Sequence, residues 1–395
     1  MRHRIIIALS SGAILCLLLS GFLVKASLSR AAAPATCGHW QVVASPNPPS
    51  SQVTLMGVAS LSSKDAWAVG YASDNQGNTT AVVEQWNGTQ WNLVQTPAPG
   101  STVYELSAVA ALSTADVWAV GQYAGTGGWQ TLIEHWDGSQ WNIIPSPNGG
   151  TDDVLNSIAA VSASDIWAVG YNENESISQG VILHWNGTQW SIVPSAGSNY
   201  YNEQLFGVTA LSSTDTWAVG SYSKYGMNGP LTFVEHWNGQ KWSQVFSPNR
   251  SRVGGQFNSV VALSATDIWA VGTSYVPTPT FEQTLVEHWD GTKWSIVWSP
   301  NHPHSGANML NGVAAVGPDE VWAVGIYTAS EGYPVPLSER WDGSTWKEVA
   351  TPVVGTEGGQ FNSVAALALT KHVWAVGRYY SSQTGTQQTL IESYC

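Results

Sequence analysis

The chain has 395 residues, of which 27 are acidic and 14 basic, and its formal net charge of −13 disfavours binding to the phosphates of nucleic acids. Only 10% of the residues are charged, whereas 22 are tryptophan and 39 are glycine. So many large aromatic residues exclude a disordered chain. Because only one apolar run is long enough to span a bilayer, a membrane protein with several spans is excluded as well.

The first 35 residues are predicted to be a targeting segment. Arg2, His3 and Arg4 precede an apolar run from Ile5 to Val24, and alanines follow at positions 31–33 and 35. This is the order of a secretory signal peptide. The apolar run is longer than the usual ~7–15 residues, so an N-terminal membrane anchor is the alternative. Both interpretations place residues 36–395 outside the cell, either secreted or held at the outer face of the cytoplasmic membrane.

Seven repeats follow, and each contains the tetrapeptide Trp-Ala-Val-Gly. The copies begin at Trp67, Trp118, Trp167, Trp217, Trp269, Trp322 and Trp374. Each repeat predicts four short strands, A to D, which in the second repeat are residues 106–112, 116–121, 131–136 and 141–145. These segments are rich in β-branched and aromatic residues and are bounded by Gly, Asn, Asp or Pro. Asn-Gly or Asp-Gly between strands C and D supplies the positive φ that a tight hairpin needs.

Four strands in a repeat of about 50 residues are typical of one propeller blade. The sequence therefore predicts an all-β fold, a seven-bladed β-propeller of four-stranded antiparallel blades. The order Val-Trp-Ala-Val-Gly, then Leu-Ile-Glu-His-Trp-Asp-Gly-Ser-Gln-Trp, then Pro-Ser-Pro resembles a kelch repeat of the galactose oxidase-like family. The departures are a single glycine after strand B, where kelch repeats have two, and tryptophan where they usually have tyrosine.

The two ends of the repeat region are predicted to meet. The last repeat stops at Tyr394 and Cys395 without a strand D, and an orphan strand D precedes the first repeat at residues 37–43. We expect residues 39–43 to complete the seventh blade. Counting along the interrupted C–D hairpin makes Cys37 and Cys395 neighbours, and the oxidising compartment implied by the signal favours a disulfide between them.

The loops of the repeats predict which face of the propeller carries function. The C–D turns have one length throughout, whereas the B–C and D–A loops vary in length and sequence. Variable loops on a rigid scaffold usually carry binding, so we expect the function on the face formed by the B–C and D–A loops, named here the long-loop face. Aromatic side chains on it suit sugar rings or peptides. The candidates are Trp129, Trp298, Tyr200, Tyr201, Tyr225 and Tyr333. The alternative is that each of them packs against its own loop, whereas the tryptophans in register with the repeat belong to the core.

Acidic residues gather around the third repeat. Asp152 and Asp153 precede its strand A, and Glu173 and Glu175 lie in its B–C loop. Four carboxylates on one rim suit Ca²⁺, although the spacing matches no calcium loop, so solvated surface charge is the alternative. No other cofactor is expected. The repeated Glu-His pairs of strand C lie in different blades, which indicates a structural role.

The chain contains none of the common catalytic motifs, such as Gly-x-Ser-x-Gly, His-Glu-x-x-His or a P-loop. A copper oxidase of the galactose oxidase type would need a cysteine cross-linked to tyrosine, and both cysteines after the signal are expected in the disulfide. The sequence therefore favours a monomeric, non-enzymatic binding or adhesion module for a cell-surface glycan or protein. The alternatives are an extracellular carbohydrate-active hydrolase or lyase with its site at the channel mouth, and a purely structural envelope protein.

Overall fold

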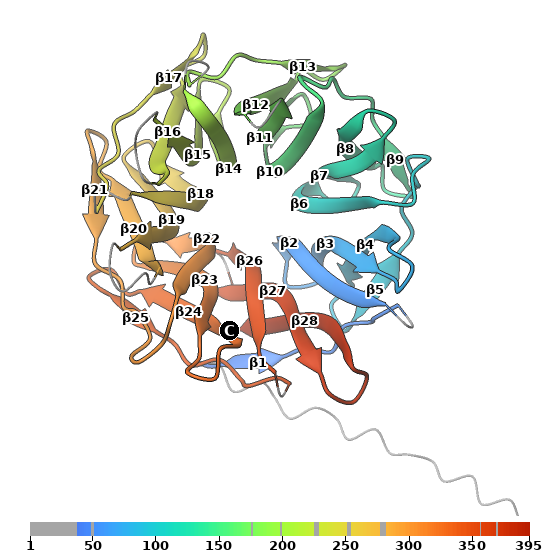
Figure 1. Ribbon diagram of the computed structural model, residues 1–395, viewed down its shortest axis with the longest axis vertical. Coiled ribbons are helices and arrows are strands. Elements are labelled where there is room, and N and C mark those ends of the chain that lie inside the picture. Colours follow the sequence, from blue (N-terminus) through green and yellow to red (C-terminus); the bar gives the residue numbers. More distant parts are fainter. Residues whose placement is uncertain are drawn as a thin grey trace, which may run out of the picture. The chain divides into compact units, whose positions relative to one another are not determined.

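The computed structural model describes residues 38–48, 51–174, 177–197, 200–224, 229–250, 254–276, 282–355, 357–368 and 370–395. In these residues, seven four-stranded antiparallel sheets surround a central axis (Figure 1). Each sheet is a blade, with strand A next to the axis and strand D at the circumference. The predicted seven-bladed propeller is confirmed.

The strands of blades 1 to 3 follow one another in sequence. Blade 1 consists of β2 (Gln52–Ser62), β3 (Asp65–Ser73), β4 (Thr79–Trp86) and β5 (Trp91–Val94). Blade 2 consists of β6 (Tyr104–Ser113), β7 (Asp116–Gly125), β8 (Gly128–Trp136) and β9 (Trp141–Ile143). Blade 3 consists of β10 (Asp152–Ser162), β11 (Asp165–Asn174), β12 (Ile177–Trp185) and β13 (Trp190–Ile192).

Blades 4 to 6 repeat this order. Blade 4 consists of β14 (Tyr201–Ser212), β15 (Asp215–Ser223), β16 (Leu231–Trp237) and β17 (Trp242–Gln244). Blade 5 consists of β18 (Gly255–Ser264), β19 (Asp267–Tyr275), β20 (Glu282–Trp289) and β21 (Trp294–Val297). Blade 6 consists of β22 (Asn308–Gly317), β23 (Glu320–Thr328), β24 (Pro334–Trp341) and β25 (Trp346–Glu348).

Blade 7 joins the two ends of the repeat region. It consists of β26 (Gly359–Leu367), β27 (His372–Ser381), β28 (Thr386–Tyr394) and β1 (Trp40–Val42). Trp40 lies opposite Tyr394, and the backbone N–H of Gly38 donates to the carbonyl of Cys395 at 2.8 Å. The predicted closure by the N-terminal strand is confirmed. Cys37 lies outside the described residues, so the disulfide stays a prediction.

The predicted signal or anchor also lies outside the described residues. Within the described ranges, no helix is long and apolar enough to cross a membrane.

The single glycine of each Trp-Ala-Val-Gly copy is required by the approach of strand A. In blade 2, a β-bulge between Leu106 and Ala108 shifts the register of β6 against β7. A Cβ atom on Gly121 would lie 2.0 Å from the carbonyl oxygen of Glu105. The corresponding distances in the other six blades are 1.9–2.1 Å. No side chain fits there, so this glycine allows strands A and B to pair.

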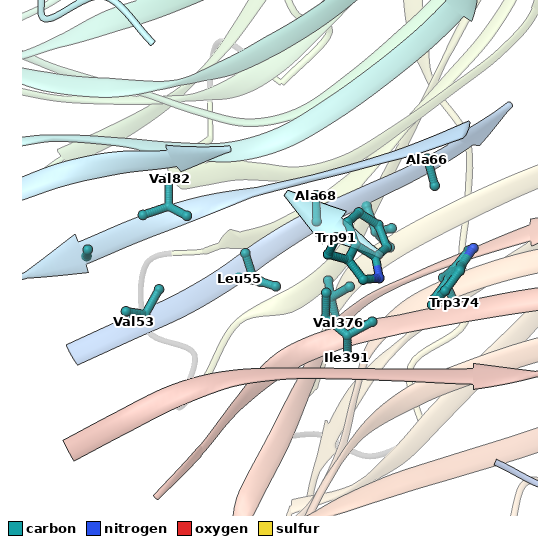
Figure 2. Close-up of a cluster of buried hydrophobic side chains, with 11 residues drawn as sticks. Val53, Leu55, Ala66, Ala68, Val82, Trp91, Trp374, Val376 and Ile391 are labelled. Atoms are coloured by element: carbon teal, nitrogen blue, oxygen red, sulfur yellow. The ribbon is translucent and has the colours of Figure 1, made fainter. Parts of the chain in front are cut away.

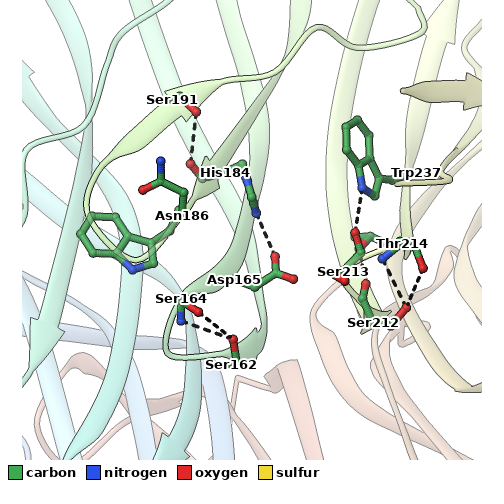
Figure 3. A network of polar contacts seen from close by, with 12 residues as sticks. Ser162, Ser164, Asp165, His184, Asn186, Ser191, Ser212, Ser213, Thr214 and Trp237 are labelled. Carbon is green, nitrogen blue, oxygen red and sulfur yellow. Dashed lines mark hydrogen bonds and ion pairs between the residues drawn. The ribbon is translucent and has the colours of Figure 1, made fainter. Parts of the chain in front are cut away.

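Neighbouring blades pack a bulky face against a small one. Figure 2 shows this contact where the ring closes: Trp374 and Val376 of blade 7 face Ala66 and Ala68 of blade 1. The strand B tryptophans are at most 3% exposed, which places them in the core as predicted. The tryptophans at the ends of strands C are only half-buried, contrary to expectation. There the indole N–H binds the A–B turn, as Trp237 does with the carbonyl of Ser213 at 3.1 Å (Figure 3).

In blades 2 to 5, a strand C histidine packs on the face of the strand B tryptophan. His184 lies 2.8 Å from Asp165 (Figure 3), and its ring stacks on Trp167 at 4.1 Å between centroids. Blades 2, 4 and 5 repeat this arrangement. In blade 6 the pair is replaced by Arg340 and Glu320, 3.0 Å apart. The Glu-His pairs are therefore structural, as predicted.

In every blade except blade 3, which has Leu183 there, the residue before this strand C position is a glutamate buried between blades. Glu84, Glu134, Glu235, Glu287, Glu339 and Glu392 are all 0% exposed. Serines of the preceding blade reach some of them, as Ser247 does with Glu287 at 3.0 Å. Burial raises the pKa of Glu134 and Glu287 to about 8. These side chains are therefore mostly neutral at pH 7.

Candidate functional site

Hollows open at three places along the described part of the long-loop face. Each lies beside the outer end of a strand B, where that strand leaves the blade for the B–C loop. One lies between blades 2 and 3, one between blades 6 and 7, and one beside residues 99–101 of blade 2. Because the lining residues come from positions that differ between repeats, each hollow has its own chemistry.

The hollow between blades 2 and 3 contains three of the predicted site residues. It has a volume of about 380 Å³ and is lined by Gln122, Trp129, Asp152, Val154, Tyr171 and Glu173. Of these six lining residues, two come from blade 2 and four from blade 3. One indole, one phenol, two carboxylates and one amide therefore surround a single space.

Trp129 lies in a strand and not in a loop, which corrects the expectation. β7 and β8 pair as far as Gly125 and Gly128, so the B–C connection is a two-residue turn. A Cβ on Gly128 would lie 2.1 Å from the carbonyl oxygen of Thr151. The backbone N–H of Trp129 donates to Asp152 Oδ1 at 2.8 Å. Contact with the next blade thus fixes the backbone that carries the half-buried indole.

Of the four predicted calcium ligands, the structure describes three, and they do not all face one space. Asp152 lies opposite Glu173 in the β10–β11 pairing, so both border the hollow. Asp153 is fully buried and accepts the backbone N–H groups of Gly149 and Gly150 at 2.8 and 2.9 Å. Glu175 lies outside the described residues. Among the residues that are described, no group of three His, Cys, Asp or Glu side chains is placed to hold a metal ion.

The amide of Gln122 is oriented by a neighbouring acid. Its Nε2 donates to Glu105 Oε1 at 2.6 Å, and its own Oε1 is buried without a hydrogen-bond partner among the described residues. Burial raises the pKa of Glu105, and burial with the negative charges of Glu173 and Glu105 raises the pKa of Tyr171. The phenol of Tyr171 therefore stays a hydrogen-bond donor at neutral pH. A phenol donor beside the carboxylate acceptors of Asp152 and Glu173 suits a ligand rich in hydroxyl groups.

The other predicted aromatics that the structure describes lie away from this hollow. Tyr200 packs on Tyr222 at 4.3 Å and donates to Gln244 Oε1 at 2.5 Å, so it holds its own loop. Tyr201 begins β14 and is 46% exposed. Trp298 follows β21 at the circumference and is 67% exposed. The half-buried Tyr333 precedes β24, and Tyr225 lies outside the described residues.

The hollow between blades 6 and 7 was missed by the sequence analysis. Its volume is about 290 Å³, and Arg378, Gln360 and Gln387 line it together with Glu357, Tyr379 and Tyr380. One signal was present: Gly-Gly-Gln-Phe-Asn-Ser occurs twice, at residues 254–259 and 358–363. Arg378 follows the second copy at the position directly after the Trp-Ala-Val-Gly glycine.

The central channel is narrow, and several of its polar groups are already bonded. The bulge residues of the seven strands A line a space of about 150 Å³. Four of them are asparagines, and each donates to a backbone carbonyl of the next blade; Asn362 closes the ring by donating to Leu55 O at 2.7 Å. Phe206 and Met56 line the same space. These asparagines link the blades.

No family model matches the chain, and no curated protein matches it. The solved structures that are similar in fold include the following three. YCF48 bound to a D1 peptide is 16% identical with a TM-score of 0.56, over 90% of this chain and 97% of that one. An ulvan lyase of a polysaccharide lyase family, bound to -[GlcA(1-4)Rha3S]-, is 10% identical with a TM-score of 0.55, over 90% and 93%. The extracellular domain of BT4673 from B. thetaiotaomicron is 9% identical with a TM-score of 0.52, over 89% and 39%.

At 9–16% sequence identity, the similarity to these structures shows the fold alone. The chain is a β-propeller, and similar propellers hold a peptide in one case and a polysaccharide in another. Membership of the kelch family stays a prediction, because no family model matches.

Proposed function

We propose that the protein is an extracellular binding module that recognises a neutral glycan in the hollow between blades 2 and 3. The observation that carries this proposal is the meeting of Trp129, Asp152 and Glu173 around one space of about 380 Å³. Indole presents a flat apolar face to the C–H groups of a sugar ring. Carboxylates accept hydrogen bonds from hydroxyl groups, and the phenol of Tyr171 donates.

The charge of the hollow selects among ligands. Two carboxylates border it, and within the described residues no basic side chain lines it. An anionic sugar or an acidic peptide would be repelled. The volume lies near the lower end of the range for small-molecule sites, about 300–1,000 Å³. One or two neutral sugar units therefore fit the site better than a folded protein surface does.

The extracellular location rests on the first 35 residues, read as a cleaved signal or as an anchor. A disulfide between Cys37 and Cys395 belongs to the same proposal. Fractionation of the native host followed by N-terminal sequencing tests the location: cleavage near residues 33–35 indicates secretion, an intact N-terminus in the membrane fraction indicates an anchor, and an intact cytoplasmic protein refutes both.

The binding test uses an array of neutral oligosaccharides, followed by titration calorimetry with the best one. Trp129→Ala and Glu173→Gln should each raise Kd about tenfold or more, since an aromatic anchor contributes about 1–2 kcal/mol or more. Trp298→Ala is the matched control, because it removes an exposed indole far from the hollow. If no neutral glycan binds, or if both hollow variants bind as the wild type does, the proposed function is wrong.

A further inference from the structure

The hollow between blades 6 and 7 is built around an arginine. Arg378 Nη1 donates to Gln387 Oε1 at 2.7 Å, and Nη2 donates to Gln360 Oε1 at 3.1 Å. Gln360 is itself oriented, because its Nε2 donates to Asn362 Oδ1 at 2.6 Å. Asn362 in turn is tied to blade 1. A chain of hydrogen bonds that starts at the channel therefore fixes the guanidinium at the rim of the hollow.

Gln360, Gln387 and Asn362 form a frame of amide groups around Arg378, and this frame does not neutralise the charge of the guanidinium. Both partners are amide carbonyls, and within the described residues no ion pair involves Arg378. Three other described cations form ion pairs: Arg340 and Lys371 with Glu320, and Lys347 with Asp342. Arg378 therefore keeps its positive charge, although the chain has 27 acidic and only 14 basic residues. Guanidinium has five N–H donors, so several remain for a ligand.

Blade 5 contains the same hydrogen-bonded pair of glutamine and asparagine, without the cation. Residues 254–259 repeat residues 358–363, and Gln256 Nε2 donates to Asn258 Oδ1 at 2.8 Å, as its counterpart does in blade 7. The residue opposite Gln256 is Thr273, whereas the residue opposite Gln360 is Arg378. The Oε1 of Gln256 accepts instead from the hydroxyl group of Tyr275, at 3.1 Å. The frame thus folds with either residue, and the arginine is not needed to form it.

We propose that this second hollow binds the carboxylate of a uronic acid unit in an acidic glycan. Guanidinium matches a carboxylate through two parallel N–H donors. Tyr379 and Tyr380 line the same space and offer apolar ring faces and hydroxyl groups to the sugar. Glu357 lines it too and accepts hydrogen bonds from sugar hydroxyls, while it repels a doubly charged phosphate. The mixed charge of the lining therefore favours a sugar acid over a simple anion.

This site lies in a different hollow from the neutral-sugar site between blades 2 and 3, so either proposal can be refuted without the other. The test is calorimetry on the purified protein with tetragalacturonate and with a glucuronate-containing tetrasaccharide. At least one of them should bind, and the methyl ester of the bound oligomer should bind at least about tenfold more weakly, because it lacks the charge. Arg378→Thr should weaken binding by a similar factor and keep the fold, since blade 5 carries threonine there. Trp129→Ala should leave this binding unchanged.

Two further variants separate the arginine from its frame. Gln360→Ala should weaken uronate binding because it frees the guanidinium, whereas Gln256→Ala in blade 5 should not change it. The proposal is overturned if neither uronate binds, if Arg378→Thr binds as the wild type does, or if the methyl ester binds equally well. It is also overturned if inorganic phosphate or an acidic peptide displaces the uronate at equal concentration, because the site would then recognise charge alone.

Discussion

The buried glutamates between blades should make the protein more stable in mild acid than at neutral pH. Glu134 is the sharpest test, because it is 0% exposed and neither of its carboxyl oxygens has a hydrogen-bond partner among the residues that the structure describes. Burial raises its pKa from an ordinary value of 4.5 to about 8. Blade 3 carries Leu183 at the same position, so the fold accepts a neutral side chain there.

The sign follows from proton linkage. A glutamate with a raised pKa in the folded state gives its full contribution below the unfolded pKa and loses it as pH rises toward the folded pKa, which here means from about 4.5 to about 8. Each pH unit inside this window costs about 1.4 kcal/mol per group. Glu134 alone should therefore lower the free energy of unfolding by about 2–3 kcal/mol between pH 5 and pH 7.

Urea unfolding of the wild type and of Glu134→Gln at pH 5, 6 and 7 measures how much Glu134 contributes to the free energy of unfolding. The stability of the variant relative to the wild type should rise by about 2–3 kcal/mol from pH 5 to pH 7. Glu134→Leu should behave in the same way, and the exposed Glu331→Gln should show no such rise. If the difference between wild type and Glu134→Gln does not change with pH, or changes in the opposite direction, Glu134 is ionised in the fold and the reasoning is refuted.

Three further predictions concern stability. Trp118→Ala should destabilise by about 3–5 kcal/mol in urea unfolding through a core cavity, whereas Trp298→Ala should stay within about 1 kcal/mol; equal losses would contradict the assigned burial. Gly121→Ala should prevent folding, as judged by circular dichroism, because its Cβ would lie 2.0 Å from a carbonyl oxygen, while Gly317→Ala, with nothing within 4 Å, should fold normally. Cys37→Ser should lower the stability by up to about 5 kcal/mol without loss of the fold, and a non-reducing peptide map of the wild type should show Cys37 linked to Cys395; two free thiols in secreted protein would disprove the disulfide.

The fold could be predicted because its signals are local and repeated seven times. Trp-Ala-Val-Gly places a bulky and a small face on strand B, and each blade supplies the partner that the next one needs. The position of strand D before the first repeat was enough to predict the closure with β28. The glycine in the C–D turn was predicted to have a positive φ, and Gly138 has φ +94°.

The outer ends of the strands could not be predicted in the same way. Strands B and C of blade 2 run to Gly125 and from Gly128, well beyond the repeated motif. Residues there differ from blade to blade, so the sequence shows no repeat, but the ladder of backbone hydrogen bonds continues regardless of side chain. This is why Trp129 was expected in a loop and lies in a strand.

The sequence by itself determined the architecture, the closure of the ring and the buried tryptophans of strands B and D, because each depends on a pattern within one repeat. Only the tertiary structure decided which non-repeated side chains meet. Trp129 and Glu173 come from different blades, and Gln360 and Gln387 reach Arg378 from two different strands. The packing of the blades and the bulges in strands A bring these side chains together. The residues that line both hollows do not recur from one repeat to the next. Both hollows therefore depend on how the blades pack in the ring.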